Sequence, residues 1–90
     1  MLIQPVQPVS VTLKIGENKY ECQMLSLTEE QLELSGQNYL EKGCQVFFMG
    51  KYFRGAARVN EIEFAQYCFT YTLDIENIQF QPGLLINTRL

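Results

Sequence analysis

Apolar residues recur at every second position in several short runs of the chain, which is the pattern of a β-strand with one buried face. In the clearest run, the residues that share a face are Tyr67, Phe69, Tyr71, Leu73 and Ile75. The alternating runs are residues 11–15, 20–24, 31–34, 52–62 and 67–75. A further run, residues 44–49, alternates little and contains two adjacent Phe residues, which predicts a strand covered on both faces.

Turn residues separate these runs. Gly and Asn, which tolerate positive φ, occur within residues 16–18, and Gly43 stands just before the run at 44–49. Residues 28–30 interrupt the alternation, residues 50–51 are a two-residue hairpin candidate, and residues 64–66 are a further turn region. The sequence therefore predicts strands joined by short connections.

The long run at 52–62 places Phe53, Gly55, Ala57 and Val59 on one face. Its small residues, Gly55 to Ala57, fit a tight bend or the close approach of a neighbouring element. A helix over residues 28–34 is the alternative for that segment, because Thr28 followed by acidic residues resembles a helix start. The segment is too short for an independent helix, so a strand is preferred.

Six such strands with no long amphipathic helix predict an all-β fold, a small six-stranded antiparallel β-barrel. The 90 residues and 47% hydrophobic content suffice for one core, so we expect a single domain over residues 1–90. Residues 1–8, with two Gln-Pro-Val repeats over residues 4–9, form an extended lead-in. Residues 79–90 form a C-terminal segment that is irregular or helical.

Composition and charge limit the classes of partner that we expect and the place of the protein in the cell. The net charge is −3 and the seven Lys and Arg residues are scattered, so we expect no nucleic acid partner. No stretch approaches the ~20 apolar residues that span a bilayer, and the start does not resemble a signal peptide. We therefore expect a cytoplasmic protein without membrane insertion.

The residues that usually carry catalysis or bind metals are missing. The chain has no His, and Cys22, Cys44 and Cys68 form no Cys-x-x-Cys pair, so no metal site is predicted. We interpret the three thiols as small buried hydrophobes, with a reactive thiol as the alternative. No phosphate-binding glycine motif occurs, and the acidic residues fit a solvated face. We expect neither an enzyme nor a bound cofactor.

A family resemblance begins at residues 26–34, and it continues through Gly43 before a hydrophobic strand, the pair Ala57 and Val59, and the aromatic strand at 69–75. Over residues 9–80 this arrangement resembles the PilZ domain family. The resemblance implies a six-stranded barrel and a bacterial regulator of type IV pili, motility or secretion. Many members bind cyclic di-GMP through an R-x-x-x-R pair and a [D/N]-x-S-x-x-G loop.

The chain departs from both cyclic di-GMP signatures. Ser26 stands in place of the Asp or Asn, Thr28 in place of the Ser, and Gln31 in place of the Gly. Residues 1–13 contain no Arg or Lys, so the bidentate partners of the ligand phosphates are missing. We therefore expect cyclic di-GMP binding to be absent or very weak.

Arg54 and Arg58 also spell R-x-x-x-R, but they lie inside a predicted strand and after the loop signature. We expect two solvated cations, paired with Glu61 or Glu63 or with Asp74. A bound anion at these arginines is the alternative.

These features predict a degenerate PilZ-like adaptor that acts through protein–protein contacts. The candidate contact residues are Tyr39, Leu40, Leu84, Leu85 and Ile86, for which capping of the core is the alternative. A second hypothesis is a cyclic di-GMP receptor with atypical contacts at Ser26, Thr28, Arg54 and Arg58. A third is an unrelated SH3-like or Sm-like barrel that binds a Pro-rich peptide or RNA, although the acidic charge disfavours RNA.

Overall fold

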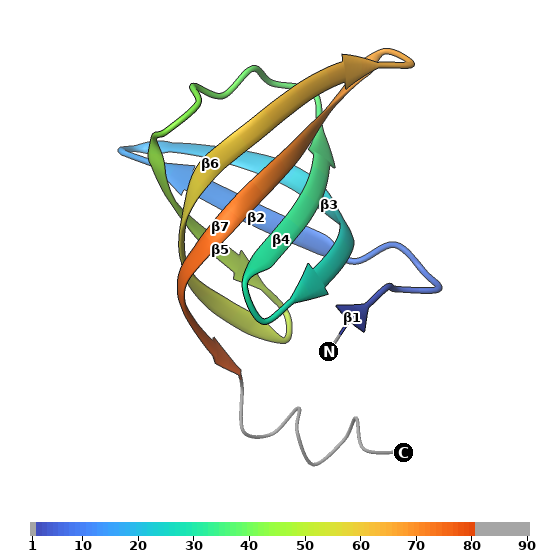
Figure 1. Ribbon diagram of the computed structural model, residues 1–90, viewed down its shortest axis with the longest axis vertical. Coiled ribbons are helices and arrows are strands. Elements are labelled where there is room, and N and C mark those ends of the chain that lie inside the picture. The colour runs from blue at the N-terminus through green and yellow to red at the C-terminus, as the bar shows by residue number, and fades with distance from the viewer. Residues whose placement is uncertain (1, 81–90) are drawn as a thin grey trace.

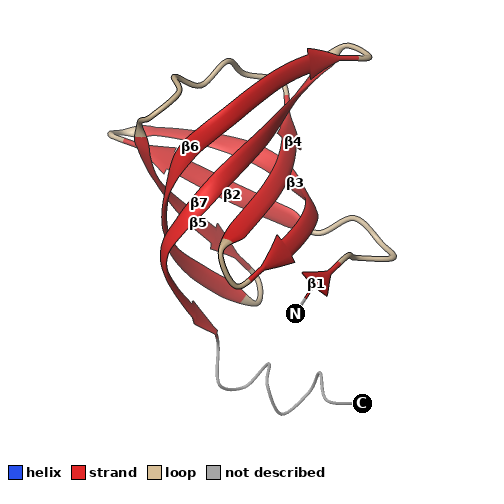
Figure 2. Ribbon diagram, in the orientation of Figure 1, coloured by secondary structure: helices blue, strands red, loops and turns tan. Residues whose placement is uncertain are grey.

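The computed structural model describes residues 2–80, and every regular element in this part of the chain is a β-strand (Figures 1 and 2). The strands are β1 (Leu2–Ile3), β2 (Ser10–Ile15), β3 (Asn18–Thr28), β4 (Gln31–Gly36), β5 (Gln45–Gly50), β6 (Phe53–Ala65) and β7 (Cys68–Phe80). Since residues 2–80 include no helix, none of them forms one that could cross a membrane. The alternative of a helix over residues 28–34 is wrong, because this segment belongs to two strands and the turn between them.

The strands form one antiparallel sheet in the order β1-β3-β2-β5-β6-β7-β4. An additional pairing of β3 with β4 closes strands β2 to β7 into a six-stranded barrel. The predicted all-β fold and six-stranded antiparallel barrel are confirmed. Within the expected lead-in, β1 adds a short extra strand, pairing Leu2 with Thr28 and Ile3 with Leu27.

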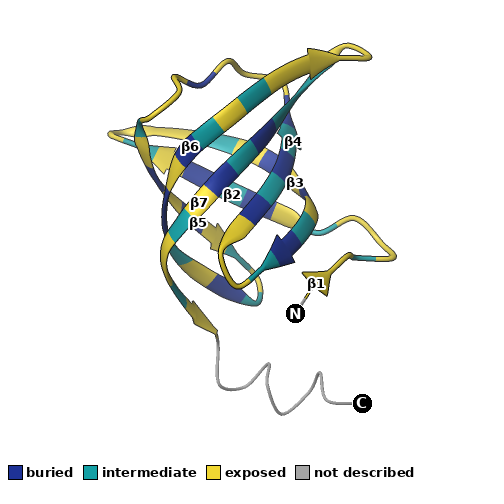
Figure 3. Cartoon of the chain, viewed as in Figure 1, coloured by how far each residue is buried: buried dark blue, intermediate teal, exposed yellow. Residues whose placement is uncertain are grey.

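Burial alternates along the strands as the apolar pattern predicts (Figure 3). Gly16, with a φ of 61°, turns β2 into β3, as predicted for residues 16–18. The fully buried large side chains of the interior are Tyr71, Phe48, Leu13, Leu27, Leu32, Leu34, Leu73, Val11, Val46 and Val59. The inward faces of the six barrel strands therefore build one common core.

The β5 strand departs from its prediction. Val46 and Phe48 are buried, but Phe47 and Met49 are exposed, so within residues 2–80 the strand is covered on one face only. The prediction of two covered faces is wrong because β5 has the core on one side, and no described element packs over the other. The hairpin that follows turns at Lys51 and Tyr52, one residue later than predicted.

The β6–β7 hairpin is the longest in the barrel, and its tip projects beyond the ring (Figure 1). Its turn consists of Gln66 and Tyr67, both left-handed with φ of 56° and 67°. The predicted turn at 64–66 is therefore misplaced, and Tyr67 is 89% exposed instead of facing the core. The β7 strand also runs on to Phe80, so the prediction is wrong for residues 79 and 80, which belong to this strand. The rest of the predicted C-terminal segment, residues 81–90, lies outside the described residues.

The connection between β4 and β5 closes one end of the barrel. Its Leu40 is buried in the core. The hydroxyl of Tyr71 donates a hydrogen bond to the carbonyl of Asn38 and accepts one from the Asn38 N–H at 3.2 Å. Gly43, with a φ of 89°, donates its N–H to the Val59 carbonyl at 2.7 Å. The left-handed Gly43 predicted from the sequence is confirmed.

Gly55 marks the close approach that the small residues of β6 predict. A Cβ at this position would lie 2.1 Å from the carbonyl oxygen of Asn77 and 2.7 Å from the ring of Phe48. Phe48 is paired across the sheet with Gly55 and fills the space that a side chain would occupy. The absence of a side chain at Gly55 is therefore a condition for packing β5, β6 and β7 together.

We predict that Gly55→Ala lowers the free energy of unfolding by about 3 kcal/mol or more, because a methyl group would overlap backbone atoms that cannot rotate away. Urea unfolding followed by circular dichroism measures the change. The matched control is Gly16→Asn, since a Cβ there meets nothing within 4 Å and Asn tolerates the left-handed φ. Equal stability of Gly55→Ala and the wild type would contradict the packing described here.

Candidate functional site

The side chains at the three positions that match the PilZ loop signature are engaged in hydrogen bonds with the barrel's own residues. The Thr28 hydroxyl oxygen accepts the N–H groups of Glu30 and Gln31 at 3.2 and 3.0 Å, which stabilises the β3–β4 turn. Ser26 donates to a carboxylate oxygen of Glu33 at 3.1 Å on the neighbouring strand. The Gln31 side-chain amide donates to Asp74 at 3.0 Å. These side chains hold the β3–β4 hairpin and its neighbour β7.

The two arginines of β6 differ in their surroundings. Arg58 forms an ion pair with Glu76 at 2.9 Å and donates to the Gly43 carbonyl at 3.1 Å. The prediction that an arginine of β6 pairs with a carboxylate is confirmed for Arg58. The predicted partners, Glu61, Glu63 or Asp74, are wrong, because the partner is Glu76. Arg54 is exposed and has no ion pair or hydrogen bond within residues 2–80.

The structure does not bring these residues to one anion site. Strands β4 and β7 lie between the β3 positions of Ser26 and Thr28 and the arginines of β6. The outer face of these intervening strands carries the carboxylates of Glu33 and Asp74. Acidic groups between the hydroxyls and the arginines would repel a phosphate ligand that reached across them.

Of the predicted contact residues, Tyr39 and Leu40 lie in the described part of the chain. Tyr39 is 65% exposed, and its ring meets the edge of Phe69 at a centroid distance of 6.1 Å. Leu40 is 3% exposed and takes the alternative role of capping the core. Leu84, Leu85 and Ile86 fall in residues 81–90, outside the described residues.

The outer face of β5 is the apolar surface that the sequence analysis missed. Phe47 and Met49 are 55% and 58% exposed and lie two residues apart on the same face of the strand. Strand pairing puts Lys14 and Ala56 on either side of Phe47, and Thr12 and Arg54 on either side of Met49. We call these two rows the β5 face. The alternation of Phe47 and Met49 with buried Val46 and Phe48 is the signal that could have revealed it.

A shallow hollow of about 310 Å³ lies beside the apolar side chains of the β5 face. Its lining is Phe47, Phe48, Met49, Arg54, Gly55, Ala56, Asn77 and Gln79. Ala56 is buried although it is on the outer side of β6, so the floor of the hollow is apolar. The hollow is of a size that admits one or two side chains of a partner.

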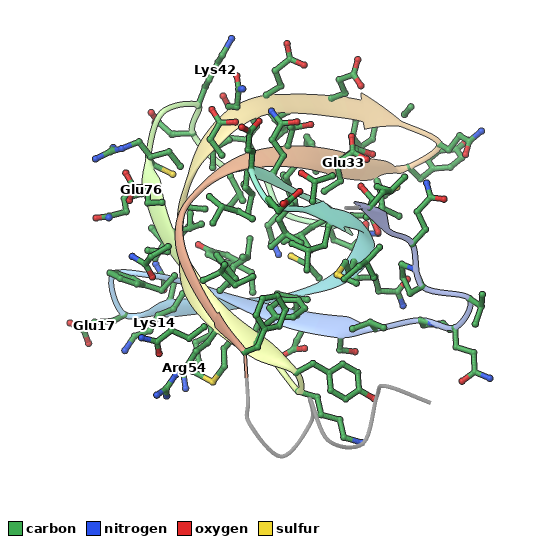
Figure 4. The ribbon with its side chains drawn as sticks, turned by 60° about the horizontal axis from the view of Figure 1, so that its bottom comes forward. Lys14, Glu17, Glu33, Lys42, Arg54 and Glu76 are labelled. Atoms are coloured by element: carbon green, nitrogen blue, oxygen red, sulfur yellow. The ribbon has the colours of Figure 1, made fainter. Side chains whose placement is uncertain are left out.

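Two cations flank the β5 face, although Glu17 lies on the same side of the barrel as Lys14 (Figure 4). Lys14 and Arg54 extend from the same side in Figure 4, and neither has an ion pair within residues 2–80. Near them, Glu21 accepts a hydrogen bond from Thr12 at 2.8 Å. Glu33 lies on the other side of the barrel (Figure 4). The β5 face is therefore an apolar centre flanked by cations, on a chain whose net charge is −3.

The three cysteines differ in burial: Cys22 is buried as predicted, whereas Cys44 and Cys68 are only half-buried, which the prediction of three buried thiols did not anticipate. All three are free, and residues 2–80 contain no cluster of acidic and Cys side chains able to hold a metal ion. Burial, with a smaller contribution from the charge of Glu21, raises the pKa of Cys22 to about 11. This thiol is therefore uncharged at neutral pH, as the interpretation of a buried hydrophobe requires.

We predict that the free energy of unfolding falls as the pH rises from about 9, the ordinary pKa of the thiol, to about 11. In this window the unfolded chain has lost the Cys22 proton while the folded chain retains it. Urea unfolding at several pH values should show a shallower fall for Cys22→Ala than for the wild type. Identical pH dependence in the two proteins would contradict the assignment.

We compared the chain with protein-family models and with curated proteins. No family model matches it, and no curated protein matches it at a significant level. Its function is therefore inferred from the residues and contacts described above.

Proposed function

We propose that this protein is a non-enzymatic adaptor domain that binds a protein partner through the β5 face. The observation that carries the proposal is the pair of exposed side chains, Phe47 and Met49, at the centre of that face. Neither side chain is needed for the core, because the inward residues of β5 already fill it. Large apolar side chains held on a rigid strand favour binding over folding as their role.

The size and charge of the β5 face fit a small apolar and acidic epitope. Fully burying an exposed Phe or Met side chain is worth about 1.5–3 kcal/mol. Because Phe47 and Met49 are already partly buried, completing their burial would supply roughly 2–3 kcal/mol together, a part of a micromolar affinity. Lys14 and Arg54 flank the anchors without ion pairs in residues 2–80, which favours acidic residues around the apolar part of the partner. The partner that we propose is thus an acidic segment with two apolar side chains.

The cell biology in the proposal rests on the resemblance of residues 9–80 to PilZ domains. A degenerate PilZ-like adaptor in the bacterial cytoplasm would regulate motility, type IV pili or secretion by contacting another protein. The dispersal of Ser26, Thr28, Arg54 and Arg58 over both sides of the barrel supports an adaptor over a cyclic di-GMP receptor.

We predict that the double variant Phe47→Ser, Met49→Ser loses partner binding at least tenfold, since both anchors lose their apolar surface. Its free energy of unfolding should stay within about 0.5 kcal/mol of the wild type, because exposed side chains contribute little to folding. Quantitative capture from lysate of the native cell, followed by titration of the captured protein, measures the loss.

The matched control is Leu25→Ser, which removes a comparable exposed apolar side chain from the bulge of β3. This variant should retain the partner. Equal capture by the wild type and the double variant would contradict the proposal. So would cyclic di-GMP binding in the low micromolar range by calorimetry, lost on Arg54→Ala, Arg58→Ala.

A further inference from the structure

The β6 strand has a free edge near the tip of the long hairpin. Pairing with β5 covers β6 from Arg54 to Arg58, and the last bonds on that side join Val59 to Gly43 and Cys44. From Asn60 to Ala65, no strand among residues 2–80 pairs with this side of β6. The free edge spans six residues, about 20 Å at ~3.4 Å per residue.

Backbone groups on this edge point toward solvent. Ala65 pairs with Cys68 across the two-residue turn, so its N–H and C=O face β7. Backbone direction alternates along a strand, and Glu63 and Glu61 therefore also face β7. The N–H and C=O groups of Ile62 and Phe64 face the opposite side, where a further strand could bond to them.

The inner side of the free edge is apolar and aromatic. Phe64 is exposed, and its ring lies 4.8 Å from that of Phe69, its partner across the hairpin. Tyr39 contacts the same Phe69 ring from the β4–β5 connection. Ile62 is half-buried against the core. A strand added here would find an apolar surface beneath every second side chain.

The outer side of the same edge is acidic. Glu61 and Glu63 are exposed and have no ion pair or hydrogen bond from their side chains within residues 2–80. In a pair formed by two copies of the chain, these carboxylates would lie opposite each other and repel. Lys or Arg side chains on an added strand would instead be attracted.

We propose that the free edge of β6, Asn60 to Ala65, binds an extended segment of a partner protein as an additional β-strand, with alternating apolar and basic residues. Main-chain hydrogen bonds to Ile62 and Phe64 would hold the segment, and the acidic outer side would select its charge. This site is independent of the β5 face, and two separate sites would let one small barrel join two partners.

The test uses the full chain and a capped seven-residue peptide that alternates Lys and Ile. We expect the amides of Ile62 and Phe64 to become protected from hydrogen exchange on titration. Two comparison peptides have the same length of seven residues. One has N-methyl groups on alternate residues and should bind about tenfold more weakly, because it cannot donate to the edge. The other has Glu in place of Lys and should also bind more weakly.

Two protein variants complete the design. Glu61→Lys, Glu63→Lys should reverse the preference between the Lys and Glu peptides, while Phe47→Ser, Met49→Ser should leave it unchanged. Protection elsewhere in the chain, no protection at millimolar peptide, or equal affinity of the N-methylated peptide would overturn the proposal. Protection of these amides in a dimer without peptide would overturn it in favour of self-pairing. None of these results bears on the β5 face, so the two proposals fail separately.

Discussion

Closure of the barrel is the constraint on which the other features of the structure depend. The pairing of β3 with β4 completes a ring of six strands around one interior, and each strand gives that interior only one of its faces. The ring closes tightly because Gly55 leaves room for the Phe48 ring and for the backbone of β7. Once the interior is full, apolar side chains on the outer faces contribute little to folding. Phe47 and Met49 are conspicuous for this reason.

Much of the fold could be predicted from the sequence because period-two burial is a local property. The inward positions of Val11, Leu13, Leu32 and Leu34 follow from their spacing alone. The turn at Gln66 and Tyr67 could not be predicted, because both residues are left-handed and such turn positions are usually occupied by Asn or Gly. Bulges in β6 and β7 shift the inward parity within the hairpin, and no local pattern marks them.

The candidate site was harder to predict than the fold, because it depends on which strands become neighbours. The two adjacent Phe residues of β5 suggested a strand covered on both faces. Which of the two faces is covered depends on the closed ring, in which β5 has the core on one side and no described element on the other. Arg58 finds its carboxylate at Glu76, whose position beside it depends on the pairing of β6 with β7. Leu40 lies in a connection but is buried in the core. A hydrogen bond between Asn38 and Tyr71, which are distant in sequence, holds this connection against the barrel.

The barrel thus offers an apolar face flanked by Lys14 and Arg54, with Glu33 on the other side of the barrel (Figure 4). The most direct test is photo-crosslinking in the native cell, with a benzophenone amino acid at Met49 or, on the opposite side, at Glu33. The account predicts a discrete protein adduct from position 49 and none from position 33. Adducts from position 33 alone, or the same adduct from both, would contradict a partner surface on the β5 face.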